Sequence, residues 1–343
     1  MNRIFTLFAA LLLVSAGVVS AQDYVIKMRT AHAVGEWVGF SIQCNGDTVD
    51  IIGAVPDPSD GSFQVTSQEI ELRGKITRLD CSSNQLVSLD VSGNPLLVEL
   101  YADNNQLTDI TFGNQPNLKA LYVGDNLFTS LDLTGLSELS TLSCYKNNLT
   151  SIDLSKTPKL TELICRENRL EGTLDLTPVP LLQWVSCFNN SLSAIKLAPD
   201  SHMGKMEIER NSIGEQEMTA LVNSLPQYQA IDEYYDWYGM DPQAFLPFEW
   251  DSDLEENVFT PQHLAVLKSK GWPVYAVDNV DVFDDLKEID DTLAGIGGVQ
   301  DAGRSSNGSP AYDLTGRAVQ PERARGGIYI MRSGDKVRKV LRK

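Results

Sequence analysis

Apolar residues recur through the middle of the chain with a period of 21 residues. The segments ITRLDCSSNQLVSLDV from Ile76, LVELYADNNQLTDITF from Leu97 and LKALYVGDNLFTSLDL from Leu118 align without gaps, and the pattern continues to residue 213 with one extra residue near Gly172. Alternating apolar and polar positions within each unit indicate a short, half-buried strand. One unit cannot bury its own leucines, whereas stacked units share a continuous core. The pattern therefore predicts a repeat solenoid, a parallel β-coil of about seven 21-residue repeats over residues 76–213.

The unit L-x-x-L-x-(C/A/V/I)-x-x-N-x-L-x-x-L-D-L resembles the leucine-rich repeat. Its short length and the cysteine at the last strand position are similar to the internalin-J-like variety of bacterial surface proteins. The resemblance covers residues 76–213, about two fifths of the chain. It implies one strand per turn of the coil and a bacterial leucine-rich-repeat surface protein.

A column of small apolar residues includes four of the five cysteines. Period-two alternation points this column inward, so we expect buried free thiols there. A zinc site needs ligands that converge on one point, which a linear column does not provide. Rungs about 4.8 Å apart leave a disulfide open as an alternative, although parallel Cβ vectors do not aim at each other. Cys44 is expected to be a buried strand residue. The column comprises Cys81, Ala102, Val123, Cys144, Cys165, Cys187 and Ile208.

A second column contains only asparagine. An inward asparagine has two donors and an acceptor, which can satisfy backbone groups where the chain turns away from the strand. We therefore expect a structural role for this column. Its members are Asn84, Asn105, Asn126, Asn147, Asn168, Asn190 and Asn211.

The two ends of a solenoid need covers. Residues 22–75 alternate in strand fashion and predict a β-rich N-terminal cap. Residues 214–277 predict a C-terminal cap with two helices, one begun by a capping box from Ser212 to Glu215 and one running from Thr260-Pro261 to just before Gly271. The acidic loop at 249–256 could bind calcium, but it lacks the glycine turn of an EF-hand, so a solvated loop is favoured.

The chain begins with an apolar stretch after Arg3 and small residues before Gln22, which predicts a signal peptide at 1–21 and no membrane insertion after cleavage. The net charge of −18, from 28 basic and 46 acidic residues, argues against nucleic acid and anionic membranes as partners. Residues 278–308 predict an acidic flexible linker.

The charge reverses in the C-terminal tail, where residues 304–343 hold ten basic and three acidic side chains, a net charge of +7. Residues 309–343 predict a small all-β tail. It resembles the C-terminal sorting domain of the type IX secretion system of Bacteroidota, which implies secretion or display on the outer cell surface. A plain β cap, or an electrostatic contact with the acidic linker, is the alternative. The likeness is carried by Tyr312, Asp313, Leu314, Gly316, Arg317, Gly327, Tyr329 and Lys339.

Catalytic chemistry has little support in the sequence. The three histidines lie in separate regions, and no catalytic triad, HExxH motif or phosphate-binding loop is present. We expect no enzyme, no metal site and no cofactor.

The outward strand positions predict a binding surface. Strands about 4.8 Å apart bring their outward side chains into one stripe of aromatic residues with charged flanks. Such a patch is typical of an interface, and we expect it to bind a protein on host or bacterial surfaces. A glycan is the alternative ligand, a passive structural component is the alternative role, and burial of the stripe by the caps or linker is the alternative arrangement. The candidate residues are Tyr101, Tyr122, Tyr145, Ile164, Arg166, Trp184 and Phe188.

Overall fold

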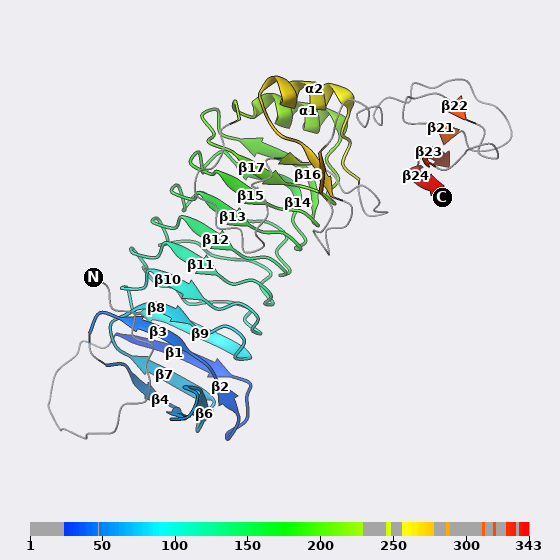
Figure 1. Ribbon diagram of the computed structural model, residues 1–343. Coiled ribbons are helices and arrows are strands. Elements are labelled where there is room, and N and C mark those ends of the chain that lie inside the picture. The colour runs from blue at the N-terminus through cyan, green and yellow to red at the C-terminus, as the bar shows by residue number, and fades with distance from the viewer. Residues whose placement is uncertain are drawn as a thin grey trace, which may run out of the picture. The chain divides into compact units, whose positions relative to one another are not determined.

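A computed structural model gives the fold (Figure 1). It describes residues 24–46, 48–228, 245–247, 256–277 and 286–288, with the backbone of the tail strands at 311–312, 318–319, 327–333 and 336–342. The predicted signal peptide, most of the acidic linker and loop, and the side chains of the basic tail lie outside the described residues. No helix in the described part is long and apolar enough to cross a membrane.

The chain divides into two compact units. The first comprises the chain as far as Leu170 together with Leu176–Leu182, and the second comprises Glu171–Asp175 together with Gln183 onward. These two units do not coincide with the predicted domains, whose boundaries separate the caps from the repeats. The predicted boundaries stay predictions.

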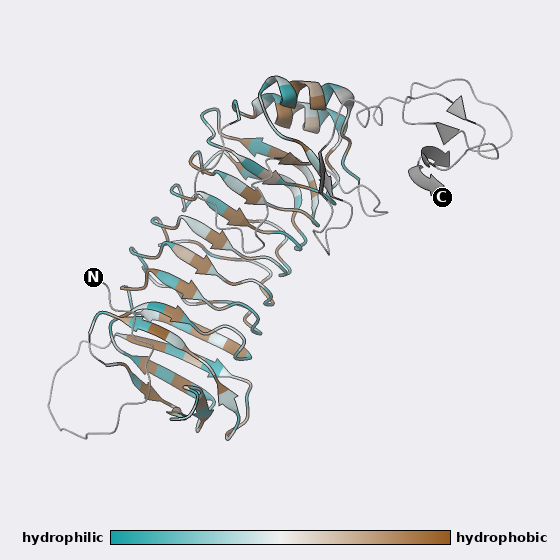
Figure 2. Cartoon of the chain, viewed as in Figure 1, coloured by the Kyte–Doolittle hydropathy of each residue, from teal (hydrophilic) through white to brown (hydrophobic). Residues whose placement is uncertain are grey.

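The first unit contains five parallel solenoid strands in register. Leu79, Leu100, Leu121, Leu142 and Leu163 occupy equivalent positions and are fully buried. The strands alternate hydrophobic and hydrophilic residues, and β10 to β13 lie side by side (Figures 1 and 2). The chain folds as a leucine-rich-repeat solenoid, as predicted. The strands are β8 (Ile76–Asp80), β10 (Glu99–Tyr101), β11 (Ala120–Tyr122), β12 (Thr141–Ser143) and β13 (Glu162–Ile164).

The N-terminal cap is built from strands, as predicted. One antiparallel sheet has the order β4-β7-β1-β9 and a second has the order β2-β6-β5, while β3 pairs antiparallel with β8. The strand β9 belongs to the first repeat, so the cap and the repeats share a sheet. The bounds are β1 (Val25–Thr30), β2 (Trp37–Val38), β3 (Ser41–Cys44), β4 (Asp50–Ile52), β5 (Ala54–Pro56), β6 (Phe63–Val65), β7 (Glu69–Arg73) and β9 (Leu86–Gly93).

The second unit continues the repeat with β15 (Trp184–Ser186) and β17 (Lys205–Glu207), which pair in parallel. The strands β14 (Glu171–Leu176) and β16 (Ser191–Leu197) form a two-stranded sheet. Two helices follow, α1 (Glu215–Ser224) and α2 (Pro261–Ser269). The remaining strands are β18 (Phe245–Leu246), β19 (Tyr275–Val277), β20 (Leu286–Glu288), β21 (Ala311–Tyr312), β22 (Ala318–Val319), β23 (Gly327–Ser333) and β24 (Lys336–Arg342).

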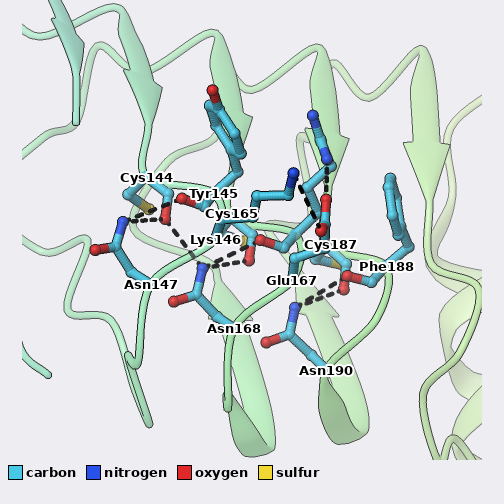
Figure 3. Close-up of polar contacts among 11 residues, drawn as sticks. Cys144, Tyr145, Lys146, Asn147, Cys165, Glu167, Asn168, Cys187, Phe188 and Asn190 are labelled. Atoms are coloured by element: carbon cyan, nitrogen blue, oxygen red, sulfur yellow. Dashed lines mark hydrogen bonds and ion pairs between the residues drawn. The ribbon is translucent and has the colours of Figure 1, made fainter. Parts of the chain in front are cut away.

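The asparagine column forms a hydrogen-bonded ladder. Asn147 donates from Nδ2 to the carbonyls of Val123, Cys144 and Tyr145 at 3.0 to 3.1 Å, and its Oδ1 accepts the N–H of Phe128 at 3.0 Å. Asn168 likewise donates to the carbonyl of Cys144 in the preceding repeat and to the carbonyls of its own turn (Figure 3). In all seven repeats the residue just before the asparagine has a positive φ, between 49° and 59°. None of these seven residues is glycine, so hydrogen bonding by the ladder holds the turn in a conformation that usually favours glycine.

The ladder has an eighth rung that the 21-residue period does not predict. Asn257 donates from Nδ2 to the carbonyls of Ile208 and Pro247 at 2.8 and 2.9 Å, and its Oδ1 accepts the N–H of Ile213 at 2.9 Å. The strand β18 pairs in parallel with β17 as the next solenoid strand. The C-terminal cap is therefore partly a further, enlarged repeat.

The cysteine column faces inward, as predicted. Cys81, Cys144, Cys165 and Cys187 are fully buried, and all five cysteines are free thiols. The expectation for Cys44 was wrong. It lies in β3 but is only half-buried, because β3 is the terminal strand of its sheet, and its Sγ lies 3.4 Å from the carbonyl oxygen of Gly46.

The predicted capping box of the first helix was also wrong. Helix α1 begins at Glu215 with Gly214 as N-cap and no side-chain cap. Ser212 is still part of the coil, because its N–H bonds to the Leu192 carbonyl at 2.8 Å and its hydroxyl donates to Glu256 at 2.7 Å.

The second helix begins and ends as predicted. A capping box is present there, formed by Thr260 and His263, with Pro261 in the first turn and Gly271 at φ +80° after the last. His263 takes the position usually held by a glutamate or glutamine.

Candidate functional site

The strand face of the first unit carries five of the predicted binding residues. Tyr101, Tyr122, Tyr145, Ile164 and Arg166 lie on or just after β10 to β13, and all five are half-buried. The remaining two belong to the second unit and are buried, since Trp184 is 8% exposed and Phe188 is 3% exposed. Alternation predicted the outward direction of these two residues but not their depth. Their contribution to binding stays a prediction.

A stack of three side chains crosses neighbouring strands of the first unit. The rings of Tyr101 and Tyr122 lie 4.5 Å apart between centroids and are inclined by only 4°. The guanidinium of Arg78 lies 4.6 Å from the centroid of Tyr101. Glu99 holds this arrangement, because its carboxylate lies 3.3 Å from Arg78 and accepts the Tyr101 hydroxyl at 3.1 Å. The ring spacing equals about one strand spacing, so the in-register sheet itself produces the stack.

The Tyr145 ring packs in a place that a glycine leaves open. Its ring lies directly against Gly124, whose N–H donates to the Asp103 carboxylate at 2.8 Å. The guanidinium of Arg166 lies 4.7 Å from the Tyr145 centroid and pairs with Glu167. Figure 3 shows the Tyr145 side chain directed away from Asn147 and the rest of the ladder. The same strand-to-turn segment thus directs Asn147 into the ladder and Tyr145 to the opposite, outward side.

The second unit repeats the pairing of a cation with an aromatic ring. Lys205 Nζ lies 4.7 Å from the Trp184 centroid and 2.9 Å from the Glu207 carboxylate. The side chains of Lys205 and Glu207 are only 11% and 10% exposed. A desolvated cation over an indole ring contributes about 2 kcal/mol, so this pairing stabilises the contact between β15 and β17.

The carboxylates of the first unit's strand face change its electrostatics. Burial raises the pKa of the Asp103 carboxyl to about 6, against the opposing effect of the hydrogen bond from Gly124. Burial and the nearby Glu162 carboxylate raise the pKa of the Tyr122 hydroxyl above its usual range. Burial is the larger cause at both groups, so their surroundings disfavour a negative charge on the Asp103 carboxyl and on the Tyr122 hydroxyl.

Arg78 and Glu99 belong to this arrangement although they are not among the residues predicted for the binding surface. Their spacing of 21 residues puts them opposite each other on β8 and β10, which is the signal that could have found the ion pair. Gly124 was missed because only the structure shows which way Tyr145 leans.

The side chains that could bind a metal ion do not cluster in the part of the chain that the structure describes. Groups of three or more histidine, cysteine, aspartate or glutamate side chains that could hold an ion are absent among those residues. The acidic loop at 249–256, for which a solvated loop is favoured over a calcium site, falls largely outside them.

Comparison with known proteins gives likeness at the level of fold. No protein-family model matches the chain, and no curated protein is detectably similar to it in sequence. Among solved structures, the functional domain of InlJ from Listeria monocytogenes, described as including a cysteine ladder, aligns at 23% identity with a TM-score of 0.39, over 57% of this chain and 48% of that one.

Two further structures align similarly. A leucine-rich-repeat protein from Leptospira interrogans matches at 18% identity with a TM-score of 0.38, over 58% of this chain and 53% of its own. The leucine-rich repeat domain of APL1B matches at 20% identity with a TM-score of 0.36, over 50% and 52%. The chain thus aligns with about half of each structure. At these scores the likeness carries no argument about function, and the fold rests on the strand register described above.

Proposed function

We propose that this chain is an exported, cell-surface binding protein that recognises a protein partner through the strand face of its solenoid. The observation that carries the proposal is the Arg78–Tyr101–Tyr122 stack, which holds two half-buried aromatic rings on an in-register sheet. Export and surface display rest on the sequence alone, from the signal peptide and the sorting-like tail.

The composition of this face supports recognition of a protein. Tyrosine and arginine are the residues that most often carry binding energy at interfaces, and here their side chains are already fixed by stacking and ion pairs. Fixing a side chain before binding lowers the entropy that association costs. Polar and charged side chains such as Glu99 and Arg166 border the rings, as a rim borders an interface core.

An array of extracellular proteins and glycans tests this proposal. The test variant is the double substitution Tyr122→Ser with Tyr145→Ser, and Trp184 is left unchanged because it is buried. The matched control is Leu127→Ser, which changes a 48% exposed leucine outside the strands. We expect binding to a protein spot that the double variant loses and the control keeps.

Three results would contradict the proposal. A blank array favours a passive structural role, and a wild-type signal confined to glycan spots favours the glycan-binding alternative. Loss of binding by the Leu127→Ser control, with the double variant unaffected, would move the site away from the strand face.

Mass spectrometry of the exported protein tests the localisation. The type IX interpretation expects a mature chain that lacks the signal peptide and the basic tail, recovered from the cell surface or medium. A mature chain that still ends at Lys343 and remains in the periplasm would contradict it.

A further inference from the structure

The sheet that carries the predicted binding residues has an edge strand in the first unit. Its strand order ends at β3, which pairs antiparallel with β8 and with no other strand in the described part of the chain. The outer side of an edge strand presents backbone N–H and C=O groups that can pair with another chain. The strand β3 is therefore a candidate for pairing with a partner.

The hydrogen bonds of β8 show which of its residues bond toward β3. The Thr77 carbonyl accepts the N–H of Val98, just before β10, at 2.7 Å. Thr77 therefore directs its carbonyl toward the next repeat. Successive residues of a strand direct their backbone groups to opposite sides, so Arg78 bonds toward β3.

Ile42 is the residue of β3 whose backbone groups point away from β8. Gln43 is in register with Arg78 and forms a hydrogen-bonded pair with it, whereas Ile42 and Leu79 form the neighbouring pair that exchanges no bonds. Outside the strand pairing, no hydrogen bond to the N–H or C=O of Ile42 is present among the described residues. Ile42 thus offers one donor and one acceptor on the outer edge of the sheet.

This edge lacks the charged side chains and prolines that often protect an edge strand. Residues 37–46 contain neither, although the net charge of the whole chain is −18. Charged residues and proline prevent unwanted strand pairing, so their absence leaves β3 able to accept another strand. The register with β8 shifts between Gln43 and Cys44, which centres the regular part of the edge on Ile42.

The N-terminal cap favours a single strand over a second solenoid as the occupant. In the cap sheet, β9 belongs to the first repeat, β1 pairs with β9, and β7 and β4 follow outward. Figure 1 shows β7 and β4 beyond β3 at this end of the first unit. A second copy would meet these strands before its own sheet reached β3, whereas one extended segment needs only about 4.8 Å of width.

We propose that β3 is a strand-addition site, where an extended segment of the partner protein bonds to the N–H and C=O of Ile42. The inference rests on the proposed function, because it names the part of the partner that the sheet takes. Ser41 is in register with Asp80, and Asp80 is in register with Tyr101. The added segment therefore continues the same sheet that holds the tyrosine stack, and its main chain supplies the hydrogen bonds.

Hydrogen exchange of single amides tests the inference on the full-length chain. The probe is a short peptide of alternating threonine and valine, and its control is the same peptide with every amide N-methylated, which removes its donors. In the free protein, the Ile42 N–H should exchange quickly and the Gln43 N–H, which bonds to β8, slowly. With free peptide at about ten times its Kd, exchange of the Ile42 N–H should slow about 10-fold, because it occurs only from the unoccupied chain.

Two substitutions at one position separate the backbone donor from the side chain. Ile42→Pro removes the outward N–H, which an edge strand tolerates, and Ile42→Ala shortens the side chain but keeps that N–H. Binding of a fluorescent form of the peptide should weaken about 10-fold more in Ile42→Pro than in Ile42→Ala. A slowly exchanging Gln43 N–H shows that β3 still pairs with β8 in each variant. If Ile42→Pro loses that protection, the comparison of the two peptides decides.

Several results would overturn the inference. They are unchanged exchange of the Ile42 N–H with millimolar peptide, equal protection by the methylated peptide, or equal binding by the two variants with β3 still paired. Protection of Ile42 that rises with protein concentration alone, together with a dimer in sedimentation, would make a second copy the occupant. If the array detects a protein that needs Tyr122 while the peptide leaves Ile42 unprotected, the proposed function stands and strand addition fails.

Discussion

The ring of Tyr145 lies against Gly124 so closely that a methyl group added at Gly124 would be 2.0 Å from Cε1 of the tyrosine. Gly124 has no positive φ, so its backbone accepts an alanine. The absence of a side chain at position 124 therefore serves Tyr145 and not the local backbone.

Gly124→Ala is predicted to destabilise the protein by about 1–3 kcal/mol, because the added methyl group displaces the packed ring. In a Tyr145→Ala background the same substitution should be neutral or slightly stabilising, since alanine reduces the freedom of the unfolded chain. Urea unfolding of the four proteins measures this double-mutant cycle. Equal costs of Gly124→Ala in both backgrounds would show that the Tyr145 ring does not pack against Gly124.

The asparagine ladder predicts a strong asymmetry between neighbouring asparagines. Asn147→Asp removes the donors to three carbonyls and places a carboxylate beside them, and each buried group left unpaired costs about 1–3 kcal/mol. Asn148→Asp changes the next, half-buried residue and should cost below about 1 kcal/mol. Thermal and urea unfolding compare the two variants. Similar losses would contradict a special role for the ladder position.

The cysteines are predicted to differ sharply in reactivity. Burial raises the pKa of Cys144 to about 12 and that of Cys81 and Cys187 above the usual range for a thiol. Since the thiolate is the reactive form, an aromatic disulfide reagent should label only Cys44 quickly in the folded protein. Cys44→Ser should then abolish fast labelling, and denaturation of the wild type should release four more thiols. Fewer than five thiols in the unfolded, unreduced protein would indicate a disulfide.

His263 predicts a loss of stability in mild acid. Burial lowers the pKa of His263 below its usual value, and its Nδ1 accepts the Thr260 N–H at 3.0 Å. The unfolded chain therefore binds the proton more readily, so the stabilising contribution is present above about pH 6.5 and is lost as the pH falls below it.

His263→Gln can keep the capping hydrogen bond but does not titrate in this range. As the pH falls from 7 to 5, the wild type should therefore lose unfolding free energy relative to this variant. Other titrating groups cancel in the comparison. A difference that stays constant with pH would contradict a neutral, buried His263.

The repeating part of the fold could be predicted because one leucine pattern determines strand, register and inward columns together. Leu142, Cys144 and Asn147 all lie where the 21-residue period places them. The period fails at its end. Asn257 follows Asn211 by 46 residues, so no periodic search connects the two, although each bonds a carbonyl and an N–H of the turn before it.

The candidate site was less predictable, because alternation determines which face a side chain is on and not what surrounds it. Trp184 and Tyr122 have equivalent directions on their strands, yet Trp184 is buried against Lys205 and Tyr122 is half-buried with small neighbours. Similarly, Ser212 has the sequence of a helix cap but is held in the coil by Leu192.

The central claim is that the strand face of the first unit is the binding surface. The most direct measurement replaces Thr141 with a photo-crosslinking residue and irradiates the complex with the protein found on the array. The same residue at position 127, an exposed position outside the strands, serves as the control. The account predicts a crosslink to the partner from position 141 and none from position 127. A crosslink from position 127 alone, or equal yields from both positions, would contradict it.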